Sequence, residues 1–146
     1  VPFHGQGMHL AFEDCVVLDE GLENPRADWQ TVFEVFESEQ IANANAIADM
    51  ALENYVEMRD TVRDPKFVLR KALSFELEKR IPDRFIPRYS MVMFHDEIPY
   101  AVAQSRGAIQ AALLEELTTD ADSIAEIDLD AAVRTVENRL PPLAGS

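Results

Sequence analysis

Two glycines near the beginning of the chain are the first residues whose types and spacing could do chemistry. Gly5 and Gly7 flank Gln6, and a helix is expected to begin directly after them, near Met8. Glycine lets a backbone approach a ligand closely, and the first turn of a helix presents unpaired N–H groups and a partial positive charge. The pattern indicates a site for an electron-rich or anionic group. Taken alone the signal is weak and an ordinary turn at a helix entry is favoured, because the third glycine of a dinucleotide fingerprint and the Gly-Lys-Ser/Thr of a phosphate loop are absent.

His9, Glu13 and Cys15 are reactive residue types for which we predict no chemistry. His9 and Glu13 are four residues apart and could touch one metal ion, but no third ligand is apparent and no Glu-x-x-His pattern supports a di-iron site. We therefore expect no metal and a solvated or loop histidine. Cys15 follows an acidic pair and is expected to be packed and inert.

Composition and charge limit the partners of the chain. In 146 residues, 47% are hydrophobic and 27% are charged, which is typical of one globular domain. Twenty-seven acidic and thirteen basic residues give a formal net charge of −14, which repels nucleic acid and anionic lipid. No apolar run is long enough for a membrane helix, and a single cysteine is typical of a reducing compartment. We expect a cytoplasmic protein without nucleic-acid or membrane partners.

The elements that would position these residues are predominantly helices, since glycine is scarce and alternating apolar and polar runs are absent. A proline-rich stretch over 81–99 is expected to be irregular or briefly extended, and to be ordered by the packing of its aromatic side chains. The helices are expected at about 8–21, 29–59, 65–79, 100–117 and 129–140.

Several segments resemble flavin-dependent aromatic hydroxylases. Residues 1–8 (VPFHGQGM), with the acidic pair that follows, resemble the third flavin-binding motif of the single-component enzymes. Residues 50–58 (MALENYVEM) and 84–92 (RFIPRYSMV) resemble, in the same order, two characteristic stretches of the kynurenine 3-monooxygenase family. The segment 140–143 (LPPL) is similar to bacterial members of that family. The resemblance covers nearly all of the chain, and the two inner motifs are more specific than the glycine loop.

The resemblance implies that the loop and the helix start hold the ring of FAD through backbone groups. His9 stands where the family usually has asparagine, so a backbone N–H contact is expected there. The second helix also lacks the family's basic and proline residues, and has Glu39-Gln40-Ile41 near that place. The implied flavin-binding positions are Pro2, Gly5, Gln6, Gly7, Met8 and His9.

For the substrate, the resemblance assigns Asn54 and Tyr89 to the amino-acid carboxylate of L-kynurenine. Asn54 lies on an apolar helical arc, and a buried amide there needs a partner that a carboxylate would supply through a charge-assisted bond. Alternatively, Asn54 bonds to a nearby backbone carbonyl and Tyr89 is a core aromatic residue. Phe3, His4 and Met58 would line the pocket for the aromatic ring.

The implied activity is NADPH- and FAD-dependent hydroxylation of L-kynurenine at ring position 3 with O2. Because the flavin carries out the difficult step, we expect the protein to supply a dry, shaped pocket and we nominate no catalytic acid or base. The implied fold is mainly α: the helical C-terminal portion of an α+β FAD-dependent monooxygenase, without its N-terminal Rossmann-like part. Residues 1–22 would end the FAD-binding domain and residues 23–146 would form the helical C-terminal region.

Two alternatives remain beside this hypothesis. One is a non-catalytic helical module that binds a protein partner through an apolar groove, and the other is a related hydroxylase of a different aromatic substrate. The first hypothesis requires the missing N-terminal part of the same protein as a partner, and predicts that this chain alone is inactive.

A basic cluster between positions 66 and 88 has two explanations. It could steer the anionic phosphates of NADPH towards the flavin, but ordinary pairing with acidic neighbours on helix surfaces is favoured. The cluster contains Lys66, Arg70, Lys71, Lys79, Arg80, Arg84 and Arg88.

Overall fold

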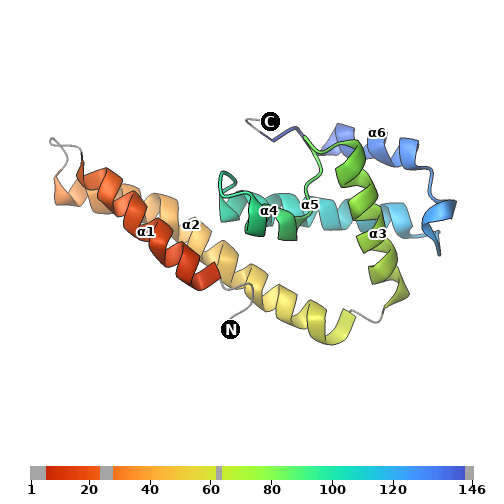
Figure 1. Cartoon of the computed structure of the whole chain (residues 1–146), viewed down its shortest axis with the longest axis horizontal. Coiled ribbons are helices and arrows are strands. Elements are labelled where there is room, and N and C mark those ends of the chain that lie inside the picture. Colours follow the sequence, from red (N-terminus) through yellow and green to blue (C-terminus); the bar gives the residue numbers. More distant parts are fainter. Residues whose placement is uncertain (1–5, 24–27, 62–63, 144–146) are drawn as a thin grey trace.

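The computed structural model describes residues 6–23, 28–61 and 64–143, and within these ranges it contains helices and no strand (Figure 1). The mainly α fold class is therefore confirmed. The elements are α1 (Gln6–Leu22), α2 (Trp29–Val56), the π-helical turn η1 (Glu57–Thr61), α3 (Pro65–Arg80), α4 (Arg88–Phe94), α5 (Tyr100–Thr118), the 3₁₀ turn η2 (Ile124–Glu126) and α6 (Leu129–Arg139). Among the described residues, no helix combines the length and apolarity that a bilayer crossing requires.

Three helices begin after an aspartate whose carboxylate accepts hydrogen bonds from the first backbone N–H groups. Asp28 accepts from the N–H of Thr31 at 2.8 Å at the start of α2. Asp64 caps α3 at 2.9 Å, where Pro65 occupies a position that needs no N–H donor. Asp128 caps α6 through two N–H groups. Such caps satisfy donors that have no partner inside the helix, and each contributes about 1 kcal/mol.

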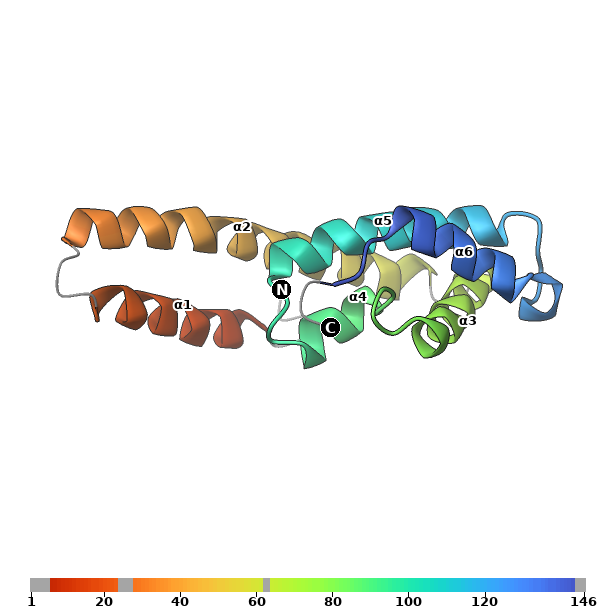
Figure 2. The same cartoon turned by 90° about the horizontal axis from the view of Figure 1, so that it is seen from above.

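The helices form an elongated molecule with two ends. α1 and α2 run antiparallel as a hairpin that projects away from the rest, and α3, α5 and α6 gather at the opposite end (Figures 1 and 2). α2 is long enough to contact both α1 and α5. α4 packs on α5 between the two ends. The long helix therefore connects the start of α1 with the region of α4.

The largest core lies at the end formed by α3, α5 and α6. Its buried side chains are Leu73, Leu77, Ile81, Phe85, Leu113, Ala132, Val136 and Leu140. Phe85 is completely buried, although it belongs to the loop between α3 and α4. This agrees with the predicted packing of aromatic side chains for Phe85 alone, because Tyr89 and Phe94 of the same stretch are 53% and 72% exposed.

A smaller core joins the hairpin to α5. It contains Ala46, Ile47 and Met50 of α2 together with Tyr100 of α5, and Leu10 of α1 packs against it. The position of the first turn of α1 is thus set by contacts with residues more than ninety positions away in the sequence.

Two predictions are corrected by the structure. The stretch 81–99 was expected to be irregular, but residues 88–94 form α4, because Pro87 is tolerated at the boundary before a helix and Met91 is completely buried. Cys15 was expected to be packed, but it is exposed, because it lies with residues 11, 12 and 16 on the exposed face of α1.

Candidate functional site

In the part of the chain that the structure describes, the first turn of α1 is open at Gly7 and Met8, whereas Gln6 is buried. A Cβ atom added to Gly7 would meet no other atom within 4 Å, and Met8 is 72% exposed. The first four N–H groups of an α-helix have no partner within the helix, and the helix dipole gives this end a partial positive charge. This turn therefore has the space and the donors that a flat, electron-rich ring needs.

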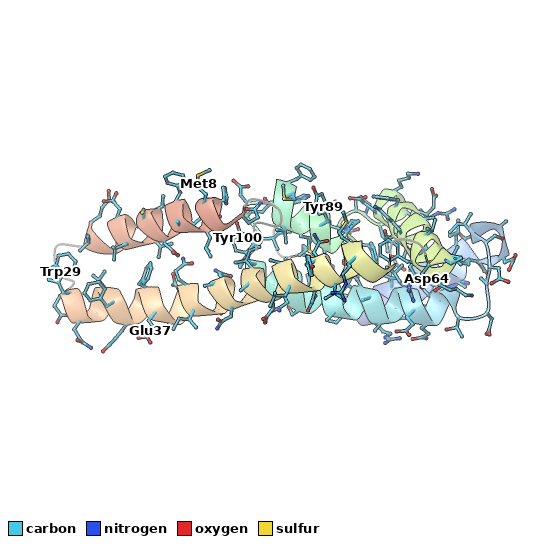
Figure 3. The ribbon with its side chains drawn as sticks, turned by 90° about the horizontal axis from the view of Figure 1, so that it is seen from below. Met8, Trp29, Glu37, Asp64, Tyr89 and Tyr100 are labelled. Atoms are coloured by element: carbon cyan, nitrogen blue, oxygen red, sulfur yellow. The ribbon has the colours of Figure 1, made fainter. Side chains whose placement is uncertain are left out.

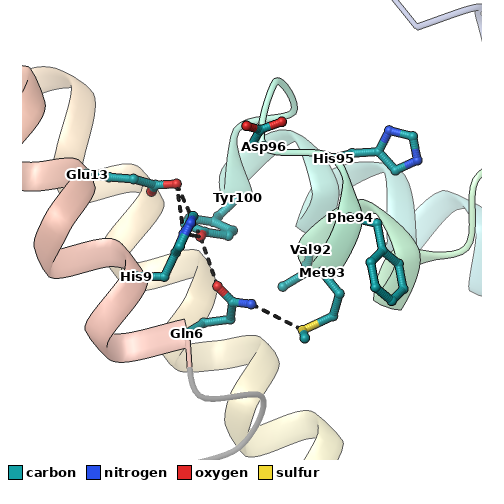
Figure 4. Close-up of a pocket in the computed structure, with 9 residues that line it drawn as sticks. All are labelled: Gln6, His9, Glu13, Val92, Met93, Phe94, His95, Asp96 and Tyr100. Carbon is teal, nitrogen blue, oxygen red and sulfur yellow. Dashed lines mark hydrogen bonds and ion pairs between the residues drawn. The ribbon is translucent and has the colours of Figure 1, made fainter.

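A hydrogen-bonded network fixes the side chains of this turn (Figure 4). The hydroxyl of Tyr100 donates to Oε1 of Gln6 at 3.2 Å, and lies 3.0 Å from Nδ1 of His9. Nδ1 of His9 is also 3.1 Å from the carboxylate of Glu13. The amide nitrogen of Gln6 donates to the sulfur of Met93 at 3.1 Å. The network joins α1 to the end of α4 and the start of α5, and it engages the ring of His9 in contacts with Tyr100 and Glu13.

The pKa of Tyr100 is shifted well away from its ordinary value. Burial of the phenol, together with the nearby negative charge of Glu13, raises the pKa of Tyr100 to about 12. The phenol is therefore protonated at neutral pH and remains available as a donor to Gln6.

A cavity of about 330 Å³ adjoins this network. Figure 4 shows the Met93 side chain turned towards Gln6, whereas the His95 ring points away from the network. The lining residues are Gln6, His9, Glu13, Val92, Met93, Phe94, His95, Asp96 and Tyr100. The cavity thus lies beside the predicted flavin-binding turn, and the predicted substrate residues Asn54, Met58 and Tyr89 do not line it.

Asn54, Met58 and Tyr89 lie near the other end of α2. Asn54 is half-buried, whereas Met58 is 59% exposed although it was placed on an apolar arc. Tyr89 is 53% exposed, and its ring contacts Phe94 edge-on with centroids 6.3 Å apart (Figure 3). The structure brings the chain neighbours of Asn54 and Tyr89 together, since Arg88 forms an ion pair with Glu53.

Four of the predicted site residues, Pro2, Phe3, His4 and Gly5, lie outside the described residues. The structure therefore positions only the second half of the glycine loop, from Gln6 onward.

Among the described residues, six of the seven members of the basic cluster, all but Lys71, pair with nearby acids or carbonyl groups, in line with the favoured explanation. Lys66 donates to the carbonyl oxygens of residues 118, 119 and 121 at the end of α5. The other pairs are Arg70 with Asp64, Lys79 with Glu76, Arg80 with Asp130, Arg84 with Asp83 and Arg88 with Glu53.

Sequence reasoning missed Tyr100 and Met93 as residues of the site. Tyr100 was assigned only as the first residue of a helix, but the structure buries its side chain in the small core against α2. No local signal connected it to Gln6, because the two residues are brought together only by the packing of α1 and α5 on α2.

These features define a mainly helical segment with an open glycine-containing turn against a buried tyrosine. No protein-family model matches the chain. It is 48% identical over its whole length to a kynurenine 3-monooxygenase of Stenotrophomonas maltophilia, and covers 32% of that protein. It is 45% identical over 142 residues to one of Myxococcus xanthus, covering 30%, and 47% identical over its whole length to one of Xanthomonas campestris, covering 32%.

The chain spans about a third of the length of the curated relatives it matches. It corresponds to a segment of a kynurenine 3-monooxygenase-like protein, which confirms the resemblance inferred from its motifs.

Proposed function

We propose that this chain is the helical C-terminal part of an NADPH- and FAD-dependent monooxygenase that hydroxylates L-kynurenine to 3-hydroxykynurenine. The observation that carries the proposal is the 45–48% identity to kynurenine 3-monooxygenases, which extends over 97–100% of the chain. The relatives contain about twice as much additional chain, and we assign the Rossmann-like FAD-binding part to it. Within this chain, residues 1–22 would complete the flavin-binding domain.

The open first turn of α1 supports the assignment of a flavin contact. Gln6, Gly7, Met8 and His9 would hold the ring through backbone groups, together with Pro2 and Gly5. The His9 side chain contacts Tyr100 and Glu13, so His9 would contact the flavin through its backbone N–H. A backbone contact does not depend on having the asparagine that the family usually has at this position. FAD, when bound there, supplies the redox chemistry by which NADPH and O2 are used.

An exposed apolar stripe on α1 supports contact between this helix and a further part of the protein. Met8, Phe12 and Val16 are spaced by one helical turn along α1, and all three are more than half exposed. Exposed apolar faces of this kind mark contacts with other protein surfaces. The additional chain found in the relatives would cover this stripe, and this chain alone would then lack both activity and a complete flavin site.

Asn54 and Tyr89 would bind the carboxylate of L-kynurenine. Asn54 offers an amide donor at the end of α2, and Tyr89 offers a phenol at the start of α4. Both can donate to a carboxylate, and charge-assisted bonds of this type are stronger than neutral ones. Phe3, His4 and Met58 would contribute to the aromatic pocket.

A chimera tests the proposal directly. This chain would replace the matching third of the Stenotrophomonas maltophilia enzyme, and FAD content, kynurenine-dependent NADPH oxidation and formation of 3-hydroxykynurenine would be measured. We expect all three to be present. FAD binding with turnover of a hydroxybenzoate in place of kynurenine would indicate the related hydroxylase, and a folded chimera without bound FAD would indicate the non-catalytic module.

Matched variants test the substrate residues in the same chimera. Asn54→Ala and Tyr89→Phe should each raise KM for kynurenine about tenfold, because each removes one bond to the carboxylate. Asn45→Ala is the control, since Asn45 is an exposed amide on the same helix. Equal KM values for the Asn54 and Asn45 variants would contradict the assigned role.

A further inference from the structure

Gly107 creates the space in which the Arg88 side chain lies. A Cβ atom at position 107 would lie 2.9 Å from Cγ and 3.1 Å from Cβ of Arg88, and closer still to Cδ. These atoms belong to the base of the side chain, which cannot move aside without moving α4. The close approach of α4 to α5 at this point therefore depends on the absence of a side chain at Gly107.

From this position the guanidinium of Arg88 reaches across to α2. Its Nη1 forms an ion pair with Oε2 of Glu53, and its Nη2 lies 4.0 Å from Oε2 of Glu57. Glu53 is in the last turn of α2, and Glu57 begins the π-helical turn that follows. One half-buried arginine thus connects α5, α4 and the end of α2.

The residues joined by this contact are the chain neighbours of the two proposed carboxylate ligands. Asn54 follows Glu53 on α2, and Tyr89 follows Arg88 on α4. A helix is stiff over one residue, so a change in the Arg88–Glu53 contact shifts the backbone that carries Tyr89 relative to the backbone that carries Asn54. No such relation holds for the other cross-helix ion pairs, such as Arg80–Asp130 between α3 and α6.

We propose that Arg88, seated on Gly107 and paired with Glu53, is a positioning residue that sets the separation of the Asn54 amide and the Tyr89 phenol. This inference rests on the proposed function, because it concerns the binding of the kynurenine carboxylate. Glu53 is half exposed, and ion pairs that remain in contact with solvent contribute little to global stability, so the main effect of Arg88 is geometric. A small displacement of groups that bind the same ligand is enough to weaken binding substantially.

The test uses the active chimera with three changes. Arg88→Met keeps most of the stem and removes the charge, Glu53→Gln removes the charge of the partner, and Gly107→Ala displaces the arginine. Each should raise KM for kynurenine by about three- to tenfold and leave kcat within about twofold, which is the pattern of lost ground-state binding. Arg88→Lys should recover part of the loss, because it restores the positive charge but not the planar fork.

The control is Arg80→Met, which removes another cross-helix ion pair, between α3 and α6 and so outside α2 and α4. It should leave KM unchanged. If Arg88→Met and Arg80→Met gave the same KM in an otherwise active chimera, the positioning role would be overturned while the proposed function stood.

A second measurement separates the two proposals if the unaltered chimera fails to hydroxylate kynurenine. Hydrogen exchange in the 146-residue chain reports whether Arg88 holds α4, through amides such as that of Met91, which donates to the carbonyl of Pro87 at 3.0 Å. Arg88→Met should speed this exchange about tenfold, and Arg80→Met should not. Unchanged exchange in the Arg88 variant would overturn the inference whatever the activity.

Discussion

The hydroxyl of Tyr100 lies 3.0 Å from Nδ1 of His9, and this contact connects the first turn of α1 with the first turn of α5 across ninety-one positions of sequence. The same hydroxyl donates to Gln6, the first described residue of the proposed flavin-binding turn. The phenol of Tyr100 therefore helps to hold that turn, together with the Gln6–Met93 contact and the packing of Leu10.

Tyr100→Phe should change how the stability of the chain depends on pH. The pKa of Tyr100 is raised to about 12 in the folded chain, against an ordinary value of about 10, so the unfolded chain loses this proton first as the pH rises. The stability conferred by the protonated phenol is fully present below about pH 10 and is lost between about pH 10 and 12. Chemical unfolding of both proteins across this range should show a steeper decline for the unaltered chain. Parallel curves would contradict the role of Tyr100.

Gly107→Ala and Gly7→Ala should affect stability in opposite directions. Alanine favours helix over glycine by about 1 kcal/mol, but a methyl group at 107 collides with Arg88 and should produce a net loss of about 1–3 kcal/mol. Position 7 has open space, so alanine there should be neutral or stabilising by up to about 1 kcal/mol. Thermal unfolding of the two variants measures the difference, and equal shifts would contradict the collision.

Removing the apolar stripe of α1 should make the isolated chain less prone to associate. Phe12→Ser with Val16→Ser removes two exposed apolar side chains, and Ala11→Ser with Cys15→Ser is the matched control at the neighbouring exposed positions. Sedimentation velocity should show less self-association only for the first pair. In the active chimera the first pair should instead lower stability by about 2–5 kcal/mol, because the stripe would be buried there. No loss in the chimera would contradict coverage of the stripe.

Arg106→Leu should destabilise the chain by about 2–4 kcal/mol. The buried guanidinium donates to the carbonyl oxygens of Arg84 at 2.7 Å and Pro141 at 2.9 Å, and leucine leaves both carbonyl groups without this donor. Arg134→Leu is the control, because Arg134 is exposed on α6 and should change stability by less than about 0.5 kcal/mol. Denaturant unfolding gives the free energy of unfolding of the two variants. Decreases of similar size would contradict a stabilising role for the buried hydrogen bonds of Arg106.

Local sequence signals were sufficient for most of the helical structure. Asp64-Pro65 predicted the start of α3, and the prolines at 99 and 141 predicted where α5 begins and α6 has ended. These signals act over one or two turns, because capping bonds and proline geometry involve only near neighbours. The helix α4 escaped prediction, since it is short and is stabilised by the burial of Met91 against α5 rather than by its own sequence.

The sequence by itself was enough to identify the family that this chain resembles and the residue types available for binding. Each of the motifs around Gly7, Asn54 and Tyr89 is an unbroken stretch of sequence and can be recognised without the fold. The tertiary structure alone decided that Tyr100 holds Gln6 and His9, and that Arg88 on Gly107 reaches Glu53. Contacts between such distant positions depend on the angles at which α1 and α5 pack on α2 and at which α4 packs on α5. Those angles follow from the fit of many side chains at once, and no local pattern of residues specifies them.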